Sequence, residues 1–195
     1  MLDQLLHYDK DLFLFLNNLG SPAWDKFWLL VTNKFTFVPL YAILLFLIYK
    51  KLGWKVLLLL VFVIAAMITF TDQITNVFKD GFERLRPCRT EGIMDTMRYI
   101  AERCGKFGFF SGHSSNSMAA AVFAGLLLRP YYKYLIFMLL FWSALVAYSR
   151  IYVGVHFPLD IFFGMVFGAV SGLLFYKLQI VLRTRFISAS HNITD

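Results

Sequence analysis

Five long apolar stretches, separated by short polar breaks, run along most of the chain. They cover about residues 27–49, 56–79, 114–128, 134–148 and 161–182, and the second becomes polar in its last turns. These lengths fit helices that cross a hydrocarbon layer about 30 Å thick, for which about 20 residues are needed. The pattern predicts an all-α, polytopic membrane helix bundle with about five transmembrane helices. We expect residues 1–195 to form a single membrane-embedded domain.

Residues 1–26 differ from these stretches, because charged side chains interrupt the apolar ones. Leucines and phenylalanines share the segment with Asp, Lys and Asn residues, and the segment breaks at Gly20, Ser21 and Pro22. Such a sequence is too charged to span a bilayer and is typical of an amphipathic helix in the membrane interface. A soluble arm is the alternative. Because the first eleven residues carry three aspartates and no long apolar core, we expect no cleaved signal peptide.

Two of the predicted spans carry a pattern on one face. Asp72, Asn76 and Lys79 are spaced at i, i+4 and i+7, so they share one face of the second span. We expect this face to look into the protein, because polar groups are costly in lipid. In the fifth span, glycine occupies every fourth position from Gly164 to Gly172, which permits a neighbouring helix to approach closely. Ordinary membrane-helix glycines would give the same pattern.

The composition agrees with a membrane protein. Hydrophobic residues make up 59% of the chain and the mean hydropathy is +0.64, which is too apolar for a soluble domain. The formal net charge of +7 is compatible with nucleic acid binding, but the cations form neither a basic tail nor a polar binding face. We therefore expect the lipid bilayer, and no nucleic acid, as the partner of this surface.

The cations are distributed unevenly over the predicted loops. One side of the membrane carries Lys50, Lys51, Lys55, Arg129, Lys133, Lys177, Arg183 and Arg185, whereas the loops on the other side mix acids with bases. Because cytoplasmic loops carry an excess of Lys and Arg, the first set indicates the cytoplasmic side. The N-terminus, a long polar loop at residues 79–112 and the stretch 149–160 then share the outer face.

Cys88 and Cys104 both fall in this outer loop. An oxidising compartment favours pairing of cysteines, and we predict a disulfide between these two. Two free thiols are the alternative, because a sequence alone does not establish connectivity.

The stretch from Ser149 to Asp160 places a cation, an imidazole and a carboxylate between two apolar spans. Such groups are expensive near lipid, and they commonly mark functional sites. Pro158 suits the first position of the following helix, so Asp160 lies in its first turn and His156 lies just outside it. Asp160 can then orient the ring of His156 as a nucleophile or base. A simple helix-capping role for the pair is the alternative.

Other polar groups mark the ends of predicted spans on the same outer side. Lys79 and Arg86 supply cations near the end of the second span, and Arg150 adds a planar guanidinium suited to phosphate oxygens. The third span begins with Ser111, Gly112 and His113. Free backbone N–H groups and the positive helix end attract an anion there. Together these groups predict a phosphate pocket in which two histidines divide nucleophilic attack and protonation of the leaving oxygen.

These residues also follow a known pattern. The chain resembles the type 2 phosphatidic acid phosphatase family of integral-membrane lipid phosphatases, whose motifs read Lys-x6-Arg-Pro, Pro-Ser-Gly-His and Ser-Arg-x5-His-x3-Asp. The first motif is matched by Lys79, Arg86 and Pro87, and the third by Ser149, Arg150, His156 and Asp160. The second is present as Ser111, Gly112 and His113, with Phe110 in place of the proline. The motifs extend over residues 79–160.

The resemblance implies metal-independent hydrolysis of a phosphate ester through a phosphohistidine, with no cofactor. It implies that His156 is the nucleophile, Asp160 its partner and His113 the general acid. It also implies that the phosphoryl group is bound, and the transition-state charge stabilised, by Lys79, Arg86, Ser111, Gly112 and Arg150.

An outer-facing site at the membrane surface suits a membrane lipid whose head group carries a terminal phosphate. Small bacterial proteins that the chain resembles act on undecaprenyl pyrophosphate, phosphatidylglycerophosphate or lipid A, and the motifs do not separate them. We expect an enzyme of the bacterial inner membrane that faces the periplasm. Undecaprenyl pyrophosphate is favoured, because that carrier must be recycled on the outer face. An anion transporter and a purely structural membrane protein are the alternatives from other classes.

Overall fold

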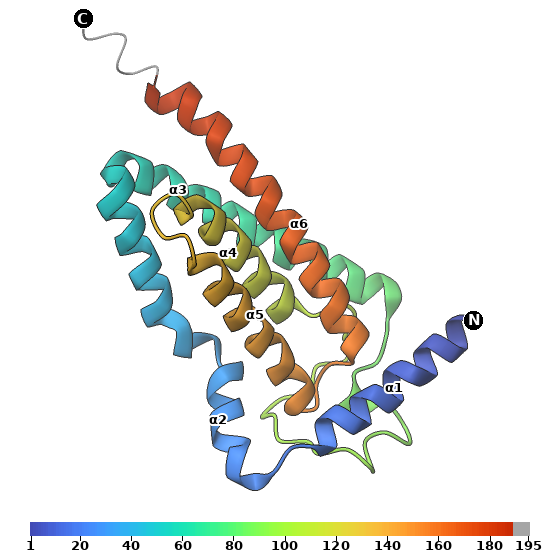
Figure 1. Ribbon diagram of the computed structural model, residues 1–195. Coiled ribbons are helices and arrows are strands. Elements are labelled where there is room, and N and C mark those ends of the chain that lie inside the picture. Colours follow the sequence, from blue (N-terminus) through green and yellow to red (C-terminus); the bar gives the residue numbers. More distant parts are fainter. Residues whose placement is uncertain (189–195) are drawn as a thin grey trace, which may run out of the picture.

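The computed structural model describes residues 1–188, and within them the chain forms six α-helices and no strand (Figure 1). The helices are α1 (Leu2–Asn18), α2 (Pro22–Thr32), α3 (Val38–Phe82), α4 (Gly112–Leu128), α5 (Leu135–Tyr152) and α6 (Pro158–Arg183). Short helical turns at Lys34–Phe37, Pro87–Arg89 and Thr184–Ser188 complete the helical structure of this part of the chain. The prediction of an all-α bundle is confirmed. Residues 189–195 of the expected single domain lie outside the described residues.

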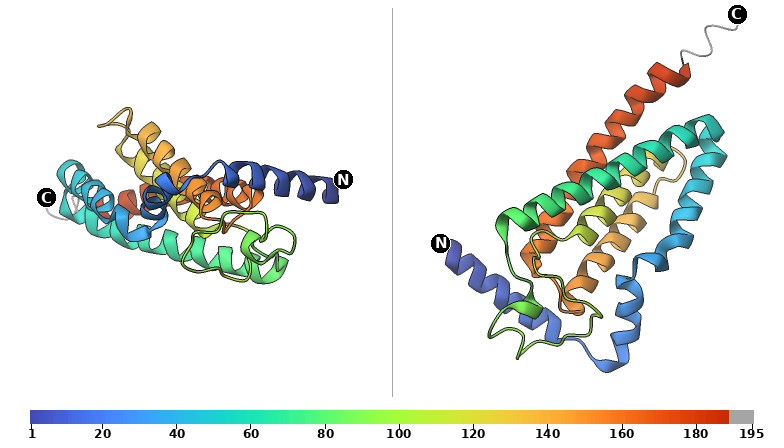
Figure 2. Two further views of the ribbon diagram at one scale, coloured as in Figure 1. Left: turned by 90° about the horizontal axis from the view of Figure 1, so that it is seen from below. Right: turned by 180° about the vertical axis from the view of Figure 1, so that it is seen from behind.

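Helix α3 is bent back on itself at Gly53. The backbone there has φ 80° and ψ 171°, a conformation that glycine adopts readily because it has no Cβ. The bend divides α3 into two arms of opposite direction, which diverge from the bend as a V (Figures 1 and 2). The two arms correspond to the first two predicted spans.

The first of these spans was predicted to begin too early. The apolar stretch 27–49 is interrupted in the structure: α2 ends at Thr32, and α3 begins only at Val38. Between them, the side chain of Asn33 accepts a hydrogen bond from the Phe35 N–H at 3.0 Å and caps a 3₁₀ turn. A local side-chain bond of this kind competes with a continuous helix.

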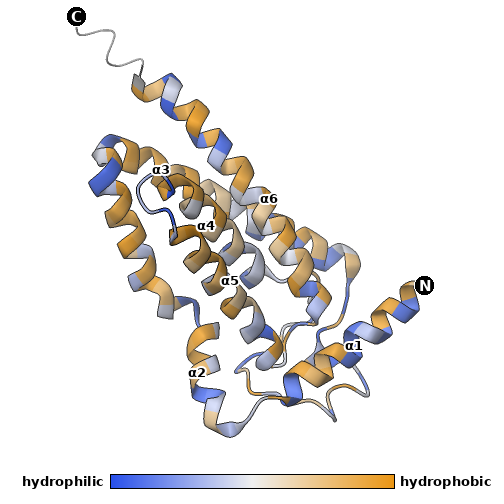
Figure 3. Ribbon diagram, viewed as in Figure 1, coloured by the Kyte–Doolittle hydropathy of each residue, from blue (hydrophilic) through white to orange (hydrophobic). Residues whose placement is uncertain are grey.

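Within residues 1–188, three segments are long and apolar enough to cross a membrane: Lys34–Phe82, which contains both arms of α3, Leu135–Tyr152 and Pro158–Ile187. Apolar residues dominate these helices in Figure 3. The shorter α4 packs against α3, α5 and α6 and is the most enclosed helix of this region. Together, the two arms of α3 with α4, α5 and α6 account for the five predicted spans.

Glycines bring α4 and α6 into close contact. A Cβ atom added at Gly164 would lie 2.6 Å from the carbonyl oxygen of Ser111, and one added at Gly172 would lie 2.6 Å from that of Ala119. A Cβ atom added at Gly168 would lie even closer to a carbonyl oxygen of α4. The close helix approach predicted from the glycine spacing is therefore confirmed, and α6 packs directly on the backbone of α4.

One end of the bundle, the end predicted to face outward, is covered by α1 and by the long loop that connects α3 to α4 (Figures 1 and 2). A disulfide joins Cys88 to Cys104 within this loop. One stripe of α1, formed by Asp9, Phe13 and Asn17, is buried, whereas most of its other side chains are exposed. Helix α1 thus packs on the bundle through a single narrow face.

Candidate active site

The structure brings the three predicted clusters together at one end of the bundle, the end that α1 and the long loop cover. They come from the last turn of α3, the following loop, the start of α4, the end of α5 and the start of α6. Of the predicted residues, six line one cavity of about 590 Å³: Lys79, Arg86, Gly112, His113, Arg150 and His156. Asp160 and Ser111 lie behind this lining.

His156 and Asp160 form a buried pair. Nδ1 of His156 lies 3.3 Å from Oδ2 of Asp160, and the two residues are 2% and 0% exposed. The same Oδ2 accepts a hydrogen bond from the Phe157 N–H at 3.0 Å, which caps the start of α6. The two roles considered for Asp160, orienting the imidazole and capping the helix, are therefore compatible, because Asp160 caps α6 and also contacts His156.

The environment of His156 favours a neutral imidazole. Burial lowers the pKa of His156 well below 6.5, and the nearby cations Arg86, Arg150 and Lys79 lower it further. A neutral ring that donates its Nδ1–H to Asp160 keeps a lone pair on Nε2. Since His156 lines the cavity, the arrangement suits a nucleophile.

Three cations face the histidines. Nε of Arg86 donates to the carbonyl oxygen of Phe107 at 2.9 Å, which leaves the other end of the guanidinium free to meet a ligand. Arg150 contacts the Thr32 hydroxyl, and its buried Nε has no hydrogen-bond partner within the described residues. Lys79 is held loosely by Asn76 at 3.5 Å. Phosphate oxygens would satisfy such donors.

The N-terminus of α4 contributes in a way that the sequence did not predict. The Ser111 N–H donates to the carbonyl oxygen of Asp160 at 2.9 Å, and the Ser111 hydroxyl accepts from the Ser114 N–H at 3.4 Å. Ser111 therefore joins the ends of α4 and α6, and its contact with phosphate stays a prediction. Gly112 and His113, which follow it, line the cavity.

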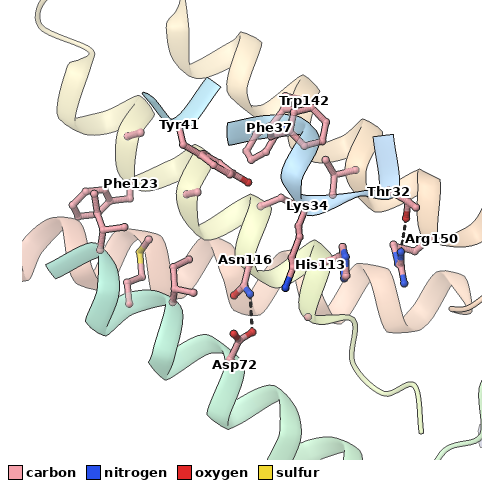
Figure 4. A pocket seen from close by; sticks show the side chains of 18 of the residues that line it. Thr32, Lys34, Phe37, Tyr41, Asp72, His113, Asn116, Phe123, Trp142 and Arg150 are labelled. Atoms are coloured by element: carbon pink, nitrogen blue, oxygen red, sulfur yellow. Dashed lines mark hydrogen bonds between the residues drawn. The ribbon is translucent and has the colours of Figure 1, made fainter. Parts of the chain in front are cut away.

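Away from the charged end, the cavity is apolar. It extends between the two arms of α3 and the helices α4 and α5 (Figure 4). Its wall there includes Phe37, Tyr41, Leu44, Met67, Phe123 and Trp142. A cavity that is cationic at one end and apolar along its length matches a lipid with an anionic head group.

Sequence reasoning missed Lys34 and Asn116 as site residues. Lys34, on the turn before α3, extends into the cavity toward His113, and Asn116 donates to Oδ1 of Asp72 at 2.7 Å on the cavity wall (Figure 4). Of the polar face predicted to look into the protein, Asp72 and Lys79 line the cavity, whereas Asn76 is exposed and is not part of its lining. Two signals were present in the sequence: Lys34 is the only charge in the apolar stretch 27–49, and Asn116 follows His113 by three residues on one helix face.

The family of the chain follows from a direct comparison of sequences. The profile of the PAP2 superfamily matches residues 55–183, which contain every predicted catalytic and phosphate-binding residue. The chain belongs to the PAP2 superfamily. The resemblance found in its motifs is thereby confirmed, and the protein is a multi-pass membrane lipid phosphatase.

Two similar phosphatases are named lipid A 4'-phosphatase. The one from Bacteroides thetaiotaomicron is 38% identical over 191 residues, which cover 96% of this chain and 84% of that protein. The one from Porphyromonas gingivalis is 34% identical over 194 residues and covers 97% and 80% of the two chains.

Two crystal structures share the fold of this phosphatase. LpxE from Aquifex aeolicus matches with a TM-score of 0.67 and 22% identity, over 86% of this chain and 93% of that one. A PAP2-type phosphatidylglycerolphosphate phosphatase from Bacillus subtilis matches with a TM-score of 0.72 and 19% identity, over 90% and 86%. At these identities the likeness establishes the fold.

Proposed function

We propose that this phosphatase removes a phosphate group from lipid A, at the periplasmic face of the inner membrane, through a phosphohistidine on His156. The observation that carries the proposal is the buried pair of His156 and Asp160 at the cationic end of a cavity that is otherwise apolar. The cations would bind the phosphate, and the apolar wall would hold an acyl chain.

The reaction follows from the positions of the two histidines. Nε2 of His156 attacks the phosphorus atom while the bond between phosphorus and the sugar oxygen breaks, and His113 protonates that leaving oxygen. A water molecule then attacks the phosphohistidine, His113 takes up its proton, and inorganic phosphate leaves. Lys79, Arg86 and Arg150 stabilise the negative charge on the equatorial oxygens in both steps. Both steps use side chains of this protein and one water molecule, and the proposed route includes no metal ion.

Lipid A replaces undecaprenyl pyrophosphate as the first candidate substrate. Two relatives that align with nearly the whole chain are named lipid A 4'-phosphatase, whereas no described residue of the cavity favours a polyprenyl pyrophosphate over lipid A. Lys34 adds a cation beside the phosphate site, which suits a large anionic head group. The periplasmic orientation is supported by the excess of cations on the opposite loops.

Phosphate release by the protein purified in detergent tests this function. Lipid A, undecaprenyl pyrophosphate and phosphatidylglycerophosphate are compared side by side in the presence of EDTA, with His156→Ala as the control. We expect lipid A to give the highest kcat/KM and His156→Ala to be inactive. Release that requires a divalent metal, or that persists in His156→Ala, contradicts the phosphohistidine mechanism. A preference for another lipid contradicts only the substrate.

A further inference from the structure

Helix α1 contacts the segment that carries His156 through its buried stripe. Asn17 donates to the carbonyl oxygens of Ile151 and Tyr152 at 3.0 and 3.1 Å, at the end of α5. The ring of Phe13 packs against that of Phe157 at a centroid distance of 5.3 Å. The third member of the stripe, Asp9, reaches the start of α6.

Asp9 is 4% exposed and is bound on both of its oxygens. Its Oδ1 accepts a hydrogen bond from the Leu159 N–H at 2.8 Å, and its Oδ2 pairs with Arg84. Burial raises the pKa of Asp9, whereas the Arg84 guanidinium acts in the opposite direction. A carboxylate this deeply placed needs its cationic partner.

Arg84 connects Asp9 to the catalytic pair. Its NH1 donates to Oδ1 of Asp160 at 2.7 Å, while its NH2 contacts Asp9. The guanidinium also lies over the ring of Phe157, 4.6 Å from its centroid, so its plane is fixed. One cation thus lies between two buried carboxylates that would otherwise repel each other.

The two oxygens of Asp160 have separate partners. Arg84 binds Oδ1, and His156 binds Oδ2. If the carboxylate rotated, both contacts would break, so Arg84 on Oδ1, together with the Phe157 N–H on Oδ2, fixes how Asp160 meets the imidazole. The position of Arg84 depends in turn on Asp9, which lies in α1, 75 residues before Arg84 in the chain.

We propose that Asp9 and Arg84 are positioning residues of the active site: Asp9 holds Arg84, and Arg84 holds Asp160 in the orientation that meets His156. Helix α1 is then a structural part of the catalytic apparatus, in addition to any contact with the membrane. The proposal rests on the proposed role of His156, and it adds Asp9, which lies outside the three family motifs, and Arg84, which occupies an unspecified position between Lys79 and Arg86 of the first motif.

Steady-state kinetics on lipid A, with thermal unfolding of each variant in detergent, test the proposal. Asp9→Asn keeps the shape of the side chain but removes its charge, and it should lower kcat about 10-fold, since a charge-assisted hydrogen bond is lost. Arg84→Gln should lower kcat about 100-fold, because Asp160 loses its orientation. The KM of both variants should stay within about twofold of the wild type, since neither residue contacts the substrate.

The double variant Asp9→Asn/Arg84→Gln distinguishes a chain of contacts from two separate effects. Residues that act as a unit are not additive, so the double variant should be no slower than Arg84→Gln alone. Arg84→Lys keeps the charge and should recover part of kcat. The matched controls are Asp11→Asn, on the exposed side of α1, and Arg129→Gln, at the far end of α4, and both should have wild-type rates.

Two results would overturn the proposal. One is a rise in KM with unchanged kcat in Arg84→Gln, which makes Arg84 a head-group ligand. The other is a double variant whose loss equals the product of the single losses. If Arg84→Gln does not fold, Asp9→Asn and Arg84→Lys are measured in its place. An unchanged kcat in both of these variants refutes the proposal. Activity that persists in His156→Ala contradicts the proposed phosphohistidine mechanism itself. This result can be distinguished from the results for the Asp9 and Arg84 variants.

Discussion

The contact between α4 and α6 can be tested by adding a single methyl group at two equivalent positions. Gly164 and Gly172 each leave the same distance, 2.6 Å, between an added Cβ and a carbonyl oxygen of α4. Gly164 faces Ser111 beside the active site, and Gly172 faces Ala119 two turns deeper in the bundle. Gly81, in the last turns of α3, has no atom within 4 Å of an added Cβ and provides the control for the same substitution.

The expected loss of stability follows from these distances. An ordinary contact of this kind is at least 3.4 Å long, so the helices must separate by roughly 0.8 Å in Gly164→Ala and in Gly172→Ala. Overpacking of this size costs about 1–3 kcal/mol. Replacing a helical glycine by alanine stabilises the helix by about 1 kcal/mol, and Gly164→Ala, Gly172→Ala and Gly81→Ala all have this gain. Both variants should therefore unfold at lower temperature than Gly81→Ala.

Activity separates the two positions. The Ser111 N–H donates to the carbonyl oxygen of Asp160 at 2.9 Å, so a shift at Gly164 moves the catalytic pair relative to His113. Misplacement by about 1 Å can cost 100-fold in rate. We expect kcat of Gly164→Ala to fall at least 10-fold below that of Gly172→Ala, although the two lose similar stability.

The measurements are thermal unfolding followed by tryptophan fluorescence and phosphate release at saturating lipid. If Gly164→Ala is as stable as Gly81→Ala, the close approach of α4 and α6 is refuted. If the Gly164 and Gly172 variants lose kcat equally, the helix contact does not determine the geometry of the site.

Three further predictions concern the loop, the cavity and pH. Lys34→Gln should raise KM about fivefold with little change in kcat, as for a partly exposed charge contact, and the exposed Lys26→Gln should change neither. Reduction of the bridge between Cys88 and Cys104, which are 16 residues apart, should destabilise the protein by about 3 kcal/mol; two alkylated cysteines in the intact mass under non-reducing conditions would disprove the bridge. Burial lowers the pKa of His156 below 6.5, so the unfolded chain binds a proton that the folded protein does not, and stability is lost as pH falls below 6.5. The loss has a limiting slope of about 1.4 kcal/mol per pH unit, and unfolding of His156→Asn should therefore depend less on pH between 6.5 and 5.

Much of the site could be predicted because the motifs lie at the ends of helices. Hydropathy locates the spans, and the motif spacing places His156 and Asp160 around the first turn of α6. Because the spans alternate in direction, Lys79, His113 and Arg150 must then lie at one end of the bundle. Local sequence thus contains the information for the cationic pocket.

The remaining features depend on contacts that local sequence does not contain. The break at Asn33 is hidden inside a continuous apolar stretch, because it depends on local side-chain hydrogen bonds of Asn33 and Thr36. The role of Asp9 depends on a partner at Leu159, far along the chain, and in the sequence it looks like one of several charges on an amphipathic helix. Arg84 likewise looks like one more cation in a polar loop, and only the fold shows that it meets two buried carboxylates.

The distribution of charge around His156 explains how one site can hold an anion and still keep its own carboxylates ionised. The cations Lys79, Arg86 and Arg150 line the cavity, whereas the buried acids Asp9 and Asp160 are not part of its lining and both pair with Arg84. Without Arg84, Asp160, which already interacts electrostatically with Arg86, is free to pair with that guanidinium and compete with the phosphate. A cation outside the cavity therefore keeps the cations inside it available. On this argument, loss of Arg84 should damage the orientation of Asp160 first, and phosphate binding only if a freed carboxylate turns toward the cavity.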